Sequence, residues 1–273
     1  MTPAIALELD PGRTKLIYEW DAQQYLQSLP LEHFMESTAQ ATQRKITVES
    51  FDVIERARPD IQCFSELLIQ YLRPGQDPDK PARVVPDNMV FVRSERIEAE
   101  GSFMVPVHRF GPTLILEYVS KSNERKDYQD NYKKYEEELK VPYYLVFHPD
   151  NENLRVFRMV REKYLELILD SEGRFAIPDL ELEAGLLDGW VRFWFRGELV
   201  PLPGDLVDEV EEQKRLRSVA ERRAVRAEGV RDAALQEKQV ALQEKQAAEQ
   251  RAKAAEAELA RLREELTRKE PKG

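Results

Sequence analysis

The chain has 273 residues, of which 42% are hydrophobic and 34% are charged. This length suits one sizeable globular domain with an extension, or two small domains, and the excess of charge indicates a solvated segment beside the globular part. The formal net charge of −10 argues against a protein that coats nucleic acid through general basic charge. It does not exclude a local site, where bound metal and nearby side chains decide what binds.

The cysteine and hydropathy patterns point to a reducing compartment. Cys63 is the single cysteine, so no internal disulfide can form, and its apolar context favours a buried thiol over a nucleophile. No apolar run approaches the roughly 20 residues of a membrane span, and the N-terminus lacks a signal-peptide pattern. We therefore expect a soluble, cytoplasmic protein with no membrane partner.

The first 60 residues are expected to support a site rather than form it. Residues 1–30 have no clean apolar period and predict an irregular N-terminal arm with a short helix. Residues 32–60 have apolar residues at helical spacing, and Pro59 should end that helix. A structural role is the simpler interpretation of this helix. The alternative is that Glu36 or Gln43 faces the site.

Residues 61–72, IQCFSELLIQYL, predict a strand more readily than a short helix, because a proline precedes them and the turn-rich PGQDPDKP follows. Glu66 lies inside this apolar run. An acid in such a place is costly unless it is paired or binds metal. Whether Glu66 joins a site or forms an exposed ion pair stays open.

Two further apolar runs each bring one acid to a strand. Asp87 lies in VVPDNMVFV, where Pro86 suits a strand start, and Glu117 lies near the end of TLILEYVS. The second run is almost continuously apolar, which is typical of a central strand covered on both faces. Inside it Glu117 needs a compensating positive charge, from a metal or a lysine. Carboxylates on neighbouring strands with lysines just beyond suit a divalent-metal site that cuts phosphodiesters.

The remaining globular segments follow in order. Residues 120–140 begin with capping residues and predict a helix, on which Tyr128, Tyr132 and Tyr135 recur at helical spacing and indicate a packing face rather than a base-stacking platform. Residues 141–147 predict a third strand and residues 148–170 a hairpin. Further strand-like segments with a Trp- and Phe-rich cluster complete the globular part.

The composition changes at about Asp205. From there to Glu270 the chain is dominated by Glu, Lys, Arg, Gln and Ala, and ALQEKQ occurs at Ala234 and again at Ala241. Because many positions of the expected seam are charged or Ala, we predict a long helix with weak coiled-coil character. It is either a solvated single helix or a stalk that forms a homodimer or binds another partner. The predicted organisation is an arm at 1–30, a domain at 31–204 and a charged helix at 205–273.

The core resembles the Uma-two family, the restriction-endonuclease-like domains of the PD-(D/E)XK nuclease superfamily. The likeness is carried by VVPDNMVFV, LILEYVSKSN, KDYQDNYKKYE and VPYYLVFHPD, and it covers about residues 30 to 200. It implies an α/β fold with a mixed central sheet flanked by helices, and cleavage of DNA that depends on Mg²⁺ or Mn²⁺. It also implies that Asp87 and Glu117 hold the metal, together with the backbone carbonyl of Tyr118.

The sequence departs from the family pattern at the catalytic lysine. Val119 stands two residues after Glu117, where the pattern often has Lys, so Lys121 and Lys134 are the candidates. The family helix commonly carries a lysine four residues after an aspartate; if that aspartate is Asp127, the position holds Asn131 here. The rival interpretation is a catalytically inert nuclease fold that acts by binding or self-association through its C-terminal helix.

Overall fold

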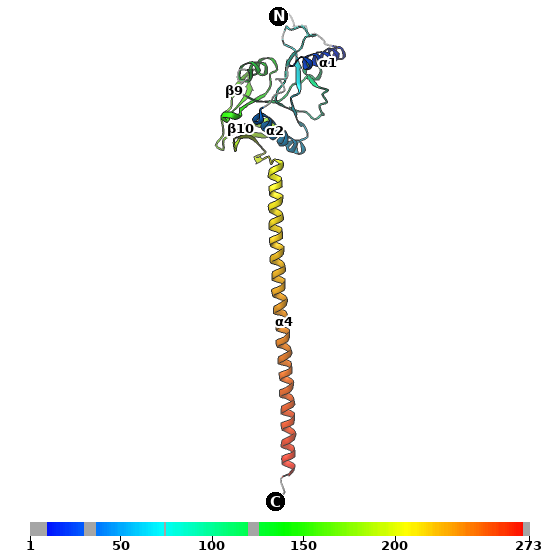
Figure 1. Ribbon diagram of the computed structural model, residues 1–273, viewed down its shortest axis with the longest axis vertical. Coiled ribbons are helices and arrows are strands. Elements are labelled where there is room, and N and C mark those ends of the chain that lie inside the picture. Colours follow the sequence, from blue (N-terminus) through cyan, green and yellow to red (C-terminus); the bar gives the residue numbers. More distant parts are fainter. Residues whose placement is uncertain (1–9, 30–36, 74, 120–125, 270–273) are drawn as a thin grey trace. The chain divides into compact units, whose positions relative to one another are not determined.

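The computed structural model describes residues 10–29, 37–73, 75–119 and 126–269. The chain divides into two compact units, Met1–Asp205 and Leu206–Gly273, and the second consists of the greater part of one continuous helix, α4 (Pro203–Lys269) (Figure 1). Within the described ranges, no helix combines the length and the apolar character needed to cross a membrane.

A six-stranded mixed sheet forms the centre of the first unit, in the order β1-β4-β6-β7-β8-β9. Its strands are β1 (Ile61–Ser65), β4 (Asn88–Val92), β6 (Leu114–Tyr118), β7 (Tyr143–His148), β8 (Asn153–Val160) and β9 (Lys163–Glu166). The β6–β7 pair is parallel and the other pairs are antiparallel. Every residue of β6 and β7 is buried, as expected for central strands covered on both faces. The predicted mixed α/β fold is therefore confirmed.

Two smaller sheets accompany the central one. The first contains β10 (Arg174–Ile177), β11 (Leu182–Leu187), β12 (Trp190–Phe195) and β13 (Glu198–Leu199), and the second has the order β3-β2-β5, with β3 (Ala82–Val84), β2 (Leu68–Tyr71) and β5 (Ser102–Met104). The single strand predicted at 61–72 is thus two strands in different sheets. The break lies at Glu66, whose left-handed φ of 51° interrupts the extended chain.

The described part of residues 1–30 is more regular than expected, because the short helix expected in this arm is an 18-residue helix, α1 (Pro11–Ser28). Asp10 caps its N-terminus and Pro11 occupies the first turn. The sequence concealed this helix because it buries little apolar surface: Leu16 and Trp20 remain 69% and 64% exposed. A buried polar contact holds it instead, since Arg83 Nε donates to Asp21 Oδ2 at 2.7 Å.

The second helix, α2 (Thr38–Ala57), confirms the helix predicted before Pro59. Ser37 and Gln40 form a capping box at its start. Its apolar side belongs to the core cluster that also contains residues of the central and four-stranded sheets, and the rings of Phe51 and Phe193 meet edge to face at 5.3 Å. This packing fixes which side of α2 is free to approach the ends of β4 and β6.

The helix predicted at 120–140 is described from Lys126 onward and winds largely as π-helix, in η2 (Lys126–Asn131) and η3 (Lys134–Glu138). Single-turn helices lie at α3 (Val105–His108), η4 (Pro149–Asn151) and η5 (Pro178–Leu180). The predicted tyrosine packing face is confirmed: Tyr132 contacts the ring of Phe157 at 5.2 Å, and Tyr135 is fully buried.

Glu136 ties η3 to the hairpin formed by β8 and β9. Its carboxylate accepts hydrogen bonds from the Tyr164 N–H at 2.7 Å and from Lys163 Nζ at 3.0 Å. Burial alone favours the neutral acid, but these two donors outweigh it and lower the pKa of Glu136 below its ordinary value of 4.5. The anionic form therefore holds the hairpin against the helix that borders the site.

Candidate functional site

The register of the central sheet brings two acids together. The antiparallel pairing of β4 with β6 sets Asn88 opposite Leu116, so Asp87, one residue before β4, comes beside Glu117. The Asp87 N–H donates to Glu117 Oε2 at 3.3 Å, and the Tyr118 N–H donates to Asp87 Oδ2 at 2.6 Å. The two carboxylates predicted from sequence thus lie within one network of backbone hydrogen bonds.

Glu117 is a buried acid, with 2% of its surface exposed. Its Oε1 accepts hydrogen bonds from Asn131 Nδ2 at 2.9 Å and from the Tyr135 hydroxyl at 2.5 Å. Donors aimed at a carboxylate stabilise its charged form and fix its orientation. The Glu117 side chain is therefore held in place from the η2–η3 helix as well as from β4.

The π-helical winding of η2 and η3 presents the residues that reach Glu117. Asn131 and Tyr135 are four residues apart and reach the same oxygen, and Lys134 Nζ lies 3.5 Å from Asn131 Oδ1. Short π-helical turns are frequent at functional sites. Of the two candidate lysines, the structure brings Lys134 to the edge of this network, while Lys121 lies outside the described residues.

An arginine from α2 connects Asp87 to a third acid. Arg44 Nη2 donates to Asp87 Oδ1 at 2.9 Å, and its Nη1 lies 2.8 Å from Glu66 Oε1. The Glu66 N–H also donates to the Asp87 carbonyl, at 3.2 Å. Glu66 therefore borders the site through Arg44, although its side chain is 61% exposed.

Gln40, one turn before Arg44, contacts the carbonyl considered as a metal ligand. Its Nε2 donates to the Tyr118 carbonyl at 2.6 Å, while its Oε1 accepts from the Ser37 N–H at 3.2 Å in the capping box. The Tyr118 hydroxyl donates into the core, and burial raises the pKa of Tyr118 well above its ordinary value. Tyr118 is therefore neutral and contributes only its backbone to the site.

Three other residues considered from the sequence are not found at this site in the described part of the chain. Gln43 is fully buried and exchanges hydrogen bonds with the Val191 backbone at 2.9 and 3.0 Å, so it supports β12 and does not face the acids. Glu36 lies outside the described residues. Cys63 is half-buried beside the core, and burial raises the pKa of its thiol, with Glu55 adding to the effect. A protonated thiol is a poor nucleophile.

The donor set suits a hard divalent cation such as Mg²⁺ or Mn²⁺, which prefers carboxylate and carbonyl oxygens. Within the described ranges, no group of three or more His, Cys, Asp or Glu side chains is placed to hold a metal. Asp87 and Glu117 would therefore hold the ion as a pair, with water or substrate oxygens completing the octahedron, which is common for Mg²⁺. Such an ion would compete with Arg44 for Asp87 Oδ1.

Sequence reasoning missed Arg44, Gln40 and Tyr135 as site residues. Arg44 and Gln40 are four apart on one helix, as are Asn131 and Tyr135 on another, and residues at that spacing share a face. That signal was present in the sequence, but only the sheet register shows that both faces converge on Asp87 and Glu117. Asn131 was noted as an exception to a lysine pattern; it is a direct partner of Glu117.

Comparison with known proteins identifies a family and a similar solved structure. The family model described as "Putative restriction endonuclease" (Uma2) matches residues 35–187, more than half of the chain. A crystal structure of a putative nuclease belonging to DUF820, from Anabaena variabilis ATCC 29413, aligns with a TM-score of 0.41 and 16% identity, covering 54% of this chain and 75% of that one. No curated protein matches. The chain therefore belongs to the Uma2 family of putative restriction endonucleases.

Proposed function

We propose that this protein is a metal-dependent endonuclease that hydrolyses phosphodiester bonds of DNA. The observation that carries the proposal is the pairing of Asp87 with Glu117 across β4 and β6, with Glu117 98% buried yet oriented by Asn131 and Tyr135. Burying an acid is costly unless hydrogen bonds or a cation compensate it, and buried acids held in one orientation beside a second carboxylate suit the binding of a divalent cation. Membership in a family described as restriction endonucleases supports the same conclusion.

Asp87 and Glu117 would hold Mg²⁺ or Mn²⁺. When bound, the cation supplies Lewis-acid chemistry, by neutralising the attacked phosphate and lowering the pKa of water. Asn131 and Tyr135 keep Glu117 in one orientation, and the Tyr118 N–H does the same for Asp87. Such fixed orientation reduces reorganisation during the reaction.

The chain's own cations would act on the substrate. Lys134 is our first candidate to stabilise charge on the phosphate or to position the attacking water, because its amine lies at the Asn131 side of the network. Lys121 is the second candidate. Arg44, which donates to Asp87 Oδ1, is a further candidate to contact a phosphate oxygen, for which its planar guanidinium is suited.

Cleavage of supercoiled plasmid in Mg²⁺ or Mn²⁺ tests the proposal. The wild type is compared with Glu117→Gln, which removes the charge and keeps the shape, and with the matched control Glu198→Gln at an exposed position on β13. We expect metal-dependent nicking by the wild type and the control, and none by Glu117→Gln. Cleavage by Glu117→Gln at the wild-type rate would refute the assigned site.

The alternative is a catalytically inert nuclease fold that acts as a binding or self-association module. It is favoured by Asn131 at the helix position considered for a lysine, and by the Arg44 guanidinium on Asp87. Metal titration separates the two. A ligand present at 100 times its dissociation constant stabilises a protein by about 2.7 kcal/mol, so a functional site should raise the unfolding midpoint in Mg²⁺ or Mn²⁺. A midpoint that is unchanged by either metal, in a protein that does not cleave, favours the inert fold.

A further inference from the structure

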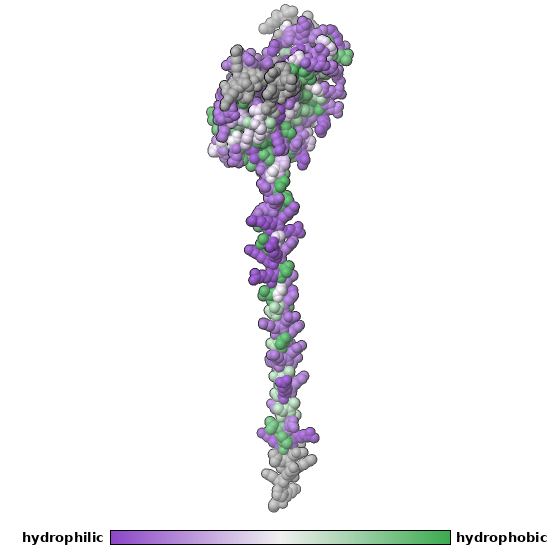
Figure 2. Space-filling view, viewed as in Figure 1, coloured by the Kyte–Doolittle hydropathy of each residue, from purple (hydrophilic) through white to green (hydrophobic). Residues whose placement is uncertain are grey.

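The second unit exposes apolar side chains along almost its whole length. Among the described side chains of α4, twelve Leu and Val residues are at least 39% exposed, and the face drawn in Figure 2 has scattered hydrophobic positions on a mainly hydrophilic surface. The twelve are Leu206, Val207, Val210, Leu216, Val219, Val225, Val230, Leu235, Val240, Leu242, Leu259 and Leu262. A lone helix gains nothing from such residues, whereas a helix with a partner can bury them.

A single heptad frame organises these residues. With Leu206 at position d and Val210 at position a, four of the twelve fall at the core positions a and d, near the two ends of the helix, and five more fall at the flanking positions e and g. The d positions are Leu206, Gln213, Ala220, Ala227, Ala234, Ala241, Ala248, Ala255 and Leu262, and the a positions are Val210, Arg217, Ala224, Arg231, Lys238, Lys245, Ala252, Leu259 and Leu266. The opposite position, f, is charged, Gln or Gly from Asp208 to Gln250.

The charges beside this seam identify the partner. In a parallel, in-register pair, each g residue meets the partner's e residue five positions further on. Four of these pairs are oppositely charged: Glu209 with Lys214, Arg223 with Glu228, Arg251 with Glu256, and Glu258 with Arg263. Val230 with Leu235 is apolar, Leu216 with Glu221 and Glu237 with Leu242 each set an apolar side chain against a charged one, and Glu244 with Glu249 is a like-charged pair. Half of the eight pairs are thus attractive between two copies of the helix, and one is repulsive.

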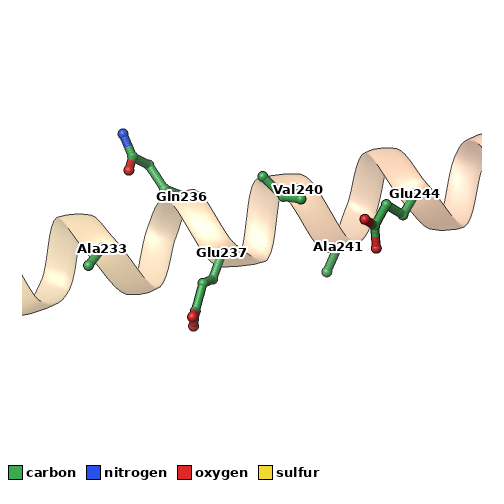
Figure 3. A pocket seen from close by; sticks show the side chains of 6 residues that line it. All are labelled: Ala233, Gln236, Glu237, Val240, Ala241 and Glu244. Atoms are coloured by element: carbon green, nitrogen blue, oxygen red, sulfur yellow. The ribbon is translucent and has the colours of Figure 1, made fainter.

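Two of the basic a positions also find partners in this arrangement. A side chain at position a packs beside the preceding g residue of the facing helix, so Lys238 and Lys245 come next to Glu237 and Glu244 of the second copy. Figure 3 shows both glutamates beside Ala241, along a shallow groove of α4. Arg217 and Arg231 instead come next to Leu216 and Val230 of the second copy, so these two arginines lower the stability of the dimer.

We propose that α4 forms a parallel, in-register, two-stranded coiled coil with a second copy of this chain. The seam extends from Leu206 to Leu266 and, at 1.5 Å per residue, is about 90 Å long. Its many Ala layers and its charged a positions make it weaker than a Leu zipper, so we expect a dimer that depends on concentration. This inference rests on the helix alone and is independent of the nuclease proposal.

The first test is the mass of the full chain in solution, measured by light scattering or sedimentation equilibrium. We expect about twice the 31.8 kDa of one chain at high protein concentration. Replacing Ala255 and Leu262 at d by Glu should raise the dissociation constant at least about 100-fold, because the adjacent a positions are Ala and Leu and the new charges would be buried unpaired in the seam. The matched control Gln243→Glu with Gln250→Glu adds the same charge at position f and should leave the dimer intact.

Disulfide trapping then tests the orientation, in a Cys63→Ser background. Ala241→Cys should cross-link to itself under mild oxidation, because equivalent d positions meet only in a parallel, in-register pair, and Gln243→Cys should not. Three outcomes would each overturn the proposal. The first is a mass that stays at 31.8 kDa up to about 100 μM. The others are a dimer weakened equally by both pairs of Glu substitutions and a dimer in which Ala241→Cys does not cross-link. Far-UV circular dichroism serves as the control that each variant keeps its helix.

Discussion

Removing the hydroxyl of Tyr135 tests whether Glu117 is ionised in the folded protein before metal binds. Tyr135→Phe deletes the donor 2.5 Å from Glu117 Oε1 and leaves the ring that packs on Tyr144. A hydrogen bond to a charged acceptor contributes about 1.5–3 kcal/mol, and one to a neutral acceptor about 0.5–1.5 kcal/mol. We therefore expect Tyr135→Phe to lower the free energy of unfolding by an amount in the first range.

Urea denaturation followed by tryptophan fluorescence measures this change, because Trp20, Trp190 and Trp194 all belong to the first unit. The matched control is Tyr164→Phe, whose hydroxyl donates to the neutral Val141 carbonyl at 3.0 Å. In a Glu117→Gln background, the cost of Tyr135→Phe should fall to that of the control. If Tyr135→Phe costs no more than Tyr164→Phe in the wild-type background, Glu117 is not a charged acceptor and our account of the site fails.

Three further predictions follow from the contacts around the site. Glu136→Gln should lower the free energy of unfolding by about 1.5–3 kcal/mol at pH 7. Because the folded pKa of Glu136 is lowered, the wild-type advantage should persist above pH 4.5 and disappear as pH falls through the folded pKa. A difference in stability between wild type and variant that stays constant in urea titrations down to pH 3 would contradict this. Arg44→Gln should bind Mg²⁺ or Mn²⁺ more tightly in calorimetry, since it removes the cation that competes for Asp87 Oδ1, and an unchanged affinity would argue against metal binding at that oxygen. Lys134→Met should reduce plasmid cleavage about 10²–10³-fold with little change in metal affinity. Lys133→Met, which alters an exposed lysine on the same helix, should cleave normally. Equal cleavage rates for the two variants would argue against Lys134 and make Lys121 the candidate for the catalytic lysine.

Local patterns predicted the central strands and, together with the family resemblance, singled out the two acids. The continuous apolar runs around Glu117 and in residues 141–147 predict buried strands, because only a strand covered on both faces has apolar residues at every position. Asp87 and Glu117 stood out because an acid inside such a run needs a partner. By contrast, the length of the helix at Pro11–Ser28 was not predicted, since a polar contact between Asp21 and Arg83 helps to hold it and its sequence has no clear apolar period.

The rest of the site depends on contacts between distant parts of the chain. Arg44 and Asp87 are 43 residues apart, and Tyr135 and Glu117 are 18 apart, so no local spacing relates them. The division of residues 61–72 between two sheets likewise follows from the left-handed turn at Glu66, which propensity does not favour.

The sequence by itself predicted the buried strands and the long charged helix, because these depend on periodicity and on composition over short windows, while the mixed α/β class and the role of the two acids were implied by the family resemblance. Only the tertiary structure decided that Arg44 bridges Asp87 and Glu66 and that Asn131 and Tyr135 hold Glu117. The physical reason is the register of β4 on β6 together with the packing of α2 and the π-helical winding of η2 and η3. Each of these features depends on packing against residues that are distant in the sequence, so local sequence patterns do not predict it.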